Sequence, residues 1–186
     1  MAATFALHLD HSGVALHRVA ADGAVAEDGG AVAAAALDDP GFDAALARMR
    51  ETVVAAGDAR APVLLVLPDS QILYTEARAS GLDRAADDSR VRSALEGATP
   101  YEVSELVYDW QEAGGILQVA VVAQETLDEA RAFAEAHGFA PTALLGAGLE
   151  GAFPGRPRFW GEAGTTAGDE PSATSAPEPP VATADP

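Results

Sequence analysis

Residues 63–67 form an uninterrupted run of large aliphatic side chains, Val-Leu-Leu-Val-Leu, set between Pro62 and the pair Pro68-Asp69. A strand with one exposed face alternates apolar and polar residues, whereas a continuous apolar run is typical of a strand buried on both faces. A second strongly apolar stretch covers residues 116–123. These runs constrain the fold most, because they predict a sheet inside an α/β domain with helices packed on it.

The first 33 residues are predicted to form a three-stranded meander. Residues 3–9 place Phe5, Leu7 and Leu9 on one face of a strand, and Asp10-His11-Ser12-Gly13 is a turn. A second strand is predicted over residues 14–19. The dipeptide Asp22-Gly23 is a hairpin signal, and a weaker third strand is predicted over residues 24–32.

Helical spacing of apolar residues predicts three helices, over residues 40–56, 87–96 and 127–137. Glycines 57 and 138 are expected to end the first and the third. The side chains expected to face the core are Phe42, Leu46, Met49, Val53, Val91, Leu95, Leu127, Ala130, Phe133 and Ala134.

Two helix starts carry capping signals. Asp39 is predicted to be the N-cap of the first helix, with Pro40 at its first position. Thr126 and Glu129 have the spacing of a capping box for the third helix.

The remaining segments complete an α/β pattern. Residues 71–77 are predicted to be extended, and residues 103–110 form either a strand or a helical turn followed by a strand. Gly114-Gly115 is a hairpin turn. A last strand is predicted over residues 141–149, and the segment 153–160, with two Phe and one Trp, is expected to pack over a sheet edge.

The domain organisation follows from this order and from a change in composition. Residues 1–160 are predicted to form one α/β domain with a mixed sheet and a small inserted subdomain at about 75–112. Residues 161–186 contain a single Val and no larger aliphatic side chain, and they are rich in Pro, Ala and Thr. They predict a disordered linker or tail, because such a segment buries too little apolar surface to offset its ordering entropy.

The net charge of −18, with 11 Arg and no Lys against 29 acidic residues, excludes nucleic acid as the expected partner and disfavours anionic lipid. It is compatible with a basic protein partner or with a plain solvated surface. The absence of cysteine excludes disulfides and thiol chemistry and fits a cytoplasmic location. No signal peptide or run of about 18 apolar residues is present, so no direct membrane insertion is expected.

Four stretches resemble actin-like-fold assembly proteins. The stretch LHLDHSGV at residues 7–14 resembles the first strand and phosphate loop of the ribonuclease-H-like half of that fold. LPDS at residues 67–70 is similar to a strand end in type IV pilus proteins of the PilM kind. VRSALEGATPY at residues 91–101, followed by VYDW at 107–110, resembles the inserted subdomain of those proteins and of the cytoplasmic region of the type II secretion protein GspL. The resemblance covers about residues 3–148.

The resemblance implies one half of a cleft that in actin-like ATPases lies between two halves. On that reading Asp10 and Gly13 would bind a nucleotide phosphate, with ATP and Mg as cofactor, if a partner, a dimer or further C-terminal sequence completes the site. His11 departs from the small or polar residues usual at that turn. The second half of an actin-like ATPase has no counterpart in this sequence.

Other motifs have simpler explanations. Asp10 to Gly13 are residues that favour turns in any context. Three histidines, His8, His11 and His17, are close in sequence, but His8 and His11 face opposite sides of a strand and His17 belongs to another strand, so no metal site is predicted. Residues 146–151 match G-x-G-x-x-G by letter, but the following Phe-Pro-Gly leaves no helix to hold a phosphate.

Tyr101, Tyr108 and Trp110, mixed with acidic residues, are the candidate partner-binding residues. The alternative is that these aromatic side chains pack against the main sheet. The sequence thus predicts a non-catalytic cytoplasmic scaffold or protein-interaction module without a cofactor, whose partners are proteins, among them components of a membrane-associated assembly. The competing hypothesis is the nucleotide-binding half-site described above.

Overall fold

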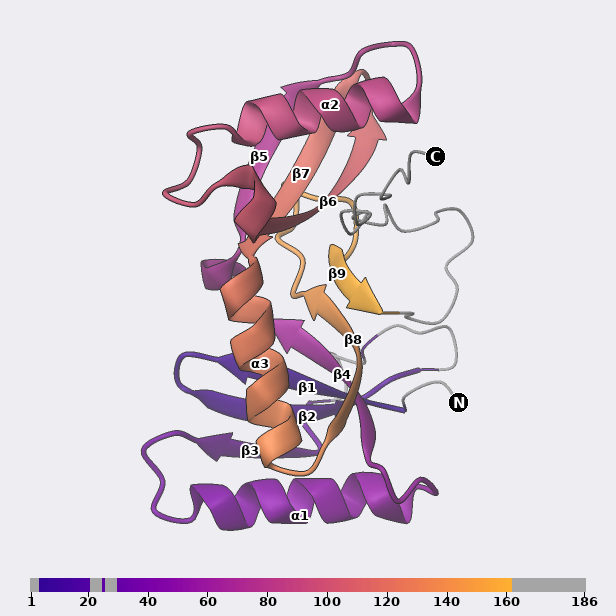
Figure 1. Cartoon of the computed structure of the whole chain (residues 1–186). Helices are drawn as coiled ribbons and strands as arrows, with labels where there is room; N and C mark the ends of the chain where they lie inside the picture. The colour runs from indigo at the N-terminus through magenta and orange to yellow at the C-terminus, as the bar shows by residue number, and fades with distance from the viewer. Residues whose placement is uncertain (1–3, 21–24, 26–29, 162–186) are drawn as a thin grey trace, which may run out of the picture.

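Two sheets organise the chain in the computed structural model, which describes residues 4–20, 25 and 30–161 (Figure 1). The larger sheet has six strands in the order β3-β2-β1-β4-β8-β9. Its strands are β1 (Phe5–Asp10), β2 (Gly13–Arg18), β3 (Ala33–Ala36), β4 (Pro62–Leu67), β8 (Ala140–Gly146) and β9 (Arg158–Gly161).

The large sheet is mixed. β1 pairs with β4, and β4 with β8, in parallel. The β1–β2, β2–β3 and β8–β9 pairs are antiparallel. β4 lies at the centre, and residues 63–67 are all buried, as their continuous apolar run predicts.

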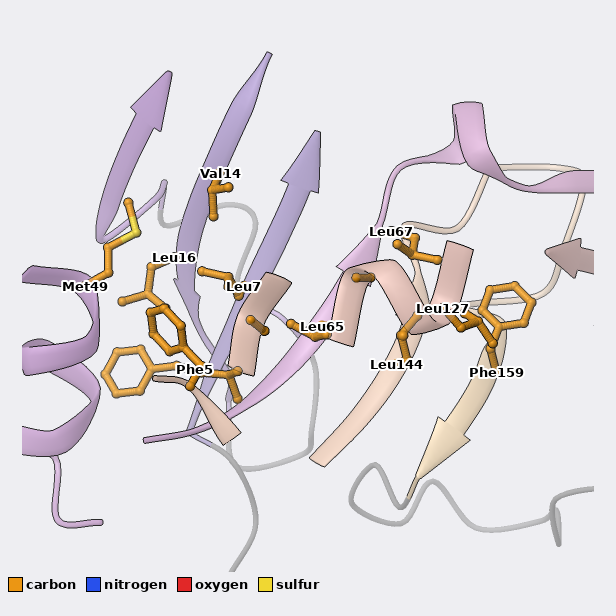
Figure 2. Close-up of a cluster of buried hydrophobic side chains, with 14 of the residues drawn as sticks. Phe5, Leu7, Val14, Leu16, Met49, Leu65, Leu67, Leu127, Leu144 and Phe159 are labelled. Atoms are coloured by element: carbon orange, nitrogen blue, oxygen red, sulfur yellow. The ribbon is translucent and has the colours of Figure 1, made fainter. Parts of the chain in front are cut away.

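One face of this sheet packs against both α1 (Phe42–Ala55) and α3 (Gln124–Ala136). The side chains that alternate on that face of β1 and β4 form the main core with residues from the two helices (Figure 2). The predicted helix periodicity is confirmed, because the buried helical residues are Leu46, Met49, Val53, Leu127, Ala130 and Ala134. The opposite face carries a smaller apolar cluster of Ala6, Val25, Leu64, Val66, Ala143 and Leu145.

An insert between β4 and α3 forms a second, three-stranded antiparallel sheet. In Figure 1 it lies at the top, α1 lies at the bottom, and α3 runs between them. The insert has its own core, in which Val91 and Leu95 of the covering helix are fully buried. Its elements are η1 (Asp69–Gln71), β5 (Leu73–Arg78), α2 (Arg84–Leu95), η2 (Val103–Glu105), β6 (Leu106–Ala113) and β7 (Ile116–Ala123).

Some predicted element boundaries differ from the structure. Among the described residues the strand after β2 is β3 at Ala33–Ala36. The predicted range 24–32 lies mostly outside the described residues, as does the Asp22-Gly23 turn, and Val25 within it forms an isolated antiparallel bridge with Val19. Gly41 is the N-cap of α1, since Asp39 accepts a hydrogen bond from the Gly41 amide at 2.7 Å and so closes a turn just before the helix.

The capping box predicted for the third helix is absent, and a capping box forms at another helix instead. Helix α3 begins after Ala123 without a side-chain cap, so the box predicted at Thr126 does not form. The pair with reciprocal capping bonds is Glu102 and Glu105, around the short helix η2. The segment from 103 to 110 is therefore a helical turn followed by a strand, which is the second of the two predicted alternatives.

Candidate interaction surface

The turn between β1 and β2 places Asp10 at the carboxyl end of a central strand. Its Oδ1 atom accepts hydrogen bonds from the amide and the hydroxyl of Ser12, each at 3.0 Å, and lies 2.8 Å from Nδ1 of His11. The bond from the Ser12 amide, followed by that from its hydroxyl, lowers the pKa of Asp10 below its ordinary value. One carboxylate oxygen is thus engaged within the turn itself.

Gly13 has a packing role in the sheet. A β-carbon at this position would overlap the carbonyl oxygen of Ala35 and would lie 3.1 Å from Cα of Ala36. Strand β3 therefore approaches β2 as closely as it does because residue 13 has no side chain. This contact explains the glycine without any ligand.

The acid that follows β4 is also engaged internally. Asp69 accepts a hydrogen bond from the Tyr74 hydroxyl at 2.5 Å, and that hydroxyl lies 3.4 Å from the amide of Leu149. Burial, followed by the hydrogen bond to Asp69, raises the pKa of Tyr74 to about 12. The cluster joins the insert to the loop after β8.

That loop holds the G-x-G-x-x-G letters, and no helix follows them within residues 152–161. A β-carbon at Gly146 would lie 2.6 Å from both Cδ1 of Ile72 and Cγ of Pro157, so this glycine serves close packing. Without a helix N-terminus, the loop lacks the aligned amides that bind phosphate in dinucleotide-binding folds.

The histidines lie on separate elements, as expected from the sequence, but two of their rings meet across the sheet. His8 and His17 lie side by side on neighbouring strands, with ring centroids 4.4 Å apart, while His11 lies in the turn beside Asp10. Burial, followed by the proximity of His17 and Arg156, lowers the pKa of His8 to about 4. Among the described residues no three His, Cys, Asp or Glu side chains gather closely enough to hold a metal ion.

The three predicted partner-binding aromatics have three different environments. Trp110 is only 4% exposed: it packs in the insert core, with the Arg84 guanidinium 4.4 Å from its ring, so it presents no surface to a partner. Tyr108 is half-buried, and its hydroxyl donates to Asp88 at 2.9 Å. Burial, followed by that bond, raises the pKa of Tyr108 to about 12.

Tyr101 is the exposed member, with 41% of its surface accessible. It borders a groove of about 620 Å³ between η2 and the first half of α3. Four carboxylates line the groove: Glu105, Glu125, Asp128 and Glu129. The sequence interpretation missed the helical part of this surface, because residues 101–105 and 123–132 come together only through the β6–β7 hairpin.

Comparisons with known proteins give a likeness in structure but none in sequence. No family model matches the chain, and no curated protein matches it in sequence. The fold is similar to "Cyto-Epsl", the cytoplasmic domain of EpsL, an inner-membrane component of the type II secretion system of Vibrio cholerae. The TM-score is 0.53 at 15% sequence identity, and the match covers 75% of this chain and 55% of that one.

This likeness confirms the predicted mixed α/β fold class and the predicted similarity to GspL-type cytoplasmic domains. The chain spans about half the length of that domain. The resemblance to PilM-like proteins and to the ribonuclease-H-like half of actin stays a prediction. Within the described part of the chain, no helix is long and apolar enough to cross a membrane.

Proposed function

We propose that this chain is a non-catalytic interaction module, a cytoplasmic scaffold domain that joins a membrane-associated protein assembly. The observation that carries the proposal is the fold shared with a cytoplasmic domain of an inner-membrane secretion component. Fold alone does not determine function, so the residues must support the same conclusion.

The strand ends support a structural role. Asp10 accepts two hydrogen bonds within its own turn, and Asp69 is bonded to a half-buried tyrosine. Gly13 makes room for a neighbouring strand. General acid–base or nucleophilic catalysis needs a reactive group held beside a suitable base with room for substrate. The groups at this edge of the sheet serve the fold itself.

The groove beside Tyr101 supports a binding role. It combines an exposed aromatic ring with a concave, acidic lining. Aromatic side chains are enriched where proteins bind one another, and complementary charge accelerates and orients their encounter. A scaffold with this surface recruits its partner through the groove between η2 and α3.

The proposal predicts that the chain associates with proteins of a membrane assembly. The test is to express the tagged full chain in its source cells, cross-link, purify it and identify the partners by mass spectrometry, with the tag alone as control. We expect components of one membrane assembly in a fixed ratio. Recovery of soluble metabolic enzymes only, or of nothing above the control, would contradict the proposal.

One feature favours a second candidate, a nucleotide-binding half-site. Asp10 lies at the carboxyl end of β1, which pairs in parallel with β4, and ligands of open α/β sheets bind outside the carboxyl ends of such strands. Calorimetric titration of the full chain with Mg-ATP and Mg-ADP separates the two functions. The scaffold predicts no saturable heat at about 1 mM nucleotide, whereas binding near about 1 µM that Asp10→Ala abolishes would establish the half-site.

A further inference from the structure

The groove between η2 and α3 is bounded by two chain segments whose conformations are fixed by local hydrogen bonds. On one side, the Glu102 amide donates to the Glu105 carboxylate at 3.0 Å as part of the capping box. The Tyr101 amide donates a hydrogen bond to the Thr99 hydroxyl oxygen at 3.2 Å. On the other side is the start of α3, where the helix meets the insert (Figure 1).

The lining is acidic and largely unneutralised. None of the described residues that line the groove is basic. Among the described residues, no salt bridge reaches Glu125, Asp128 or Glu129, and the side-chain amide of Gln124 donates to Asp128 at 3.1 Å. The chain as a whole carries −18, so the field of the protein strengthens the local preference for a cation.

The groove also offers apolar contact. Tyr101 lies at the groove, and Ala123 and Ala132 leave space in the lining that larger side chains would fill. An arginine or lysine on an aromatic face adds a cation–π contact, and the aliphatic stem of that side chain packs on small residues. The combination suits a chain segment that carries both charge and apolar surface.

We infer that the groove binds a basic segment of a partner protein, in which Arg or Lys side chains face the carboxylates of α3 and an adjacent side chain packs on Tyr101. The inference deepens the proposed function and rests on it. The charge complementarity identifies the occupant as a cationic polypeptide segment rather than nucleic acid or anionic lipid, both of which the acidic lining repels.

The first test maps binding on the full chain by NMR, for which a mass of 18.9 kDa is suitable. The probe is a synthetic amphipathic peptide with Arg at i, i+4 and one Leu face, and the control is the same peptide with Glu in place of Arg. We expect the Arg peptide to shift amide signals of residues 101–105 and 123–132, and the Glu peptide to shift none. Shifts spread evenly over the acidic surface, or centred elsewhere, would overturn the inference.

A matched pair of double variants measures the contribution of charge. Glu125→Gln with Glu129→Gln neutralises two groove carboxylates, and Glu51→Gln with Glu76→Gln neutralises two exposed carboxylates outside it. We expect about a tenfold loss of peptide affinity for the first pair and less than about twofold for the second. Equal losses for the two pairs would show that only net charge matters and would overturn the site.

Tyr101→Ala separates the aromatic contact from the charges. At an ionic strength of about 0.15 M, where the screening length is about 8 Å, the variant should bind the Arg peptide several-fold more weakly than the parent. If Tyr101→Ala binds as the parent does at every ionic strength, the aromatic part of the inference fails. The variant should lose little stability in urea unfolding, because 41% of the residue's surface is exposed.

The two levels of the proposal can fail separately. If the parent and the groove variants recover the same membrane assembly equally well in the cross-linking experiment, the groove inference fails and the scaffold function stands. If the Arg peptide maps to the groove but no assembly is recovered, the site stands without the function. Binding of the free polyamine spermine in place of the peptide, with equal affinity, would contradict a polypeptide occupant.

Discussion

Replacing Gly13 with alanine tests whether this glycine serves the sheet or a phosphate. A β-carbon at residue 13 would overlap the backbone carbonyl of Ala35, and its next neighbours, at 3.1 Å, are also backbone atoms of β3. Backbone cannot rotate away as the end of a long side chain can. The substitution must therefore push β3 away from β2, along the register that pairs Gly13 with Ala36 and Val14 with Ala35.

The expected cost is that of an extra methyl group forced into a well-packed site, about 1–3 kcal/mol. For a domain of this size, 1 kcal/mol lowers the melting temperature by roughly 2–4 °C, so the fall should be roughly 2–12 °C. The loss concentrates at β3, a strand of four residues that contacts α1.

The assay is urea unfolding of the full chain, with hydrogen exchange to locate the change. The amides of β3 should exchange faster in Gly13→Ala than in the parent. Gly41→Ala is the control for the site of the change, because its β-carbon would meet only the Asp39 side chain, at 3.2 Å. Alanine is a poorer N-cap than glycine, so this variant should cost about 1 kcal/mol, but it should leave the exchange of the β3 amides unchanged. A Gly13→Ala protein with unchanged stability and unchanged exchange would refute this account of the sheet.

Three further predictions concern buried polar and aromatic groups. Because burial lowers the pKa of His8 from 6.5 to about 4, the unfolded chain takes up a proton that the folded chain does not, so the free energy of unfolding should fall as the pH drops from about 6.5 to 4. The loss should be about 1–2 kcal/mol after allowance for solvent screening, and His8→Gln should flatten this part of the profile in urea titrations. Trp110→Ala should cost about 3–5 kcal/mol in the same assay, whereas Trp160→Ala, at a site 39% exposed, should cost far less; equal costs would contradict the burial of Trp110. Tyr108→Phe removes the hydroxyl bond to Asp88 and should cost about 0.5–1.5 kcal/mol; no loss would show that this bond does not stabilise the insert.

The elements that periodicity determines were predictable. Residues 63–67 could only be a strand buried on both faces, and Leu46, Met49 and Val53 could only line one face of a helix. Strand β3 was not predictable, because its four alanines show no alternation of apolar and polar residues that would mark a face. The hairpin signal at Asp22-Gly23 instead led to a predicted strand over residues 24–32. Its position depends on Gly13, a contact across the sheet that local sequence does not encode.

Helix starts were mispredicted for a related reason. Asp39 has the chemistry of a cap, but its carboxylate bonds to the amide two residues later and closes a turn instead. The competition between a turn and a cap is decided by the backbone path into the helix, which the packing of α1 sets. The true cap of α2, Asp83, accepts from the Ala86 amide at 2.8 Å and lies earlier than the predicted start.

One side of the candidate surface, at Tyr101, was predictable from the sequence, and the other side, on α3, was not. The sequence identified Tyr101 through its acidic and aromatic surroundings, but it could not separate Tyr101, which is exposed, from Trp110, which the insert core buries. Alternation along β6 does not reveal which face α2 covers. The carboxylates of α3 join Tyr101 only through tertiary structure, as His8 joins His17 through strand pairing.

The most direct test of the scaffold function is sedimentation of the full chain with membrane vesicles from its source, prepared with the cytoplasmic face outward. The account predicts saturable binding at about micromolar concentration that is lost when the vesicles are first treated with protease, and no binding to protein-free liposomes. Undiminished binding after protease treatment, equal binding to bare liposomes, or no binding at all would contradict a scaffold that joins a membrane-associated protein assembly.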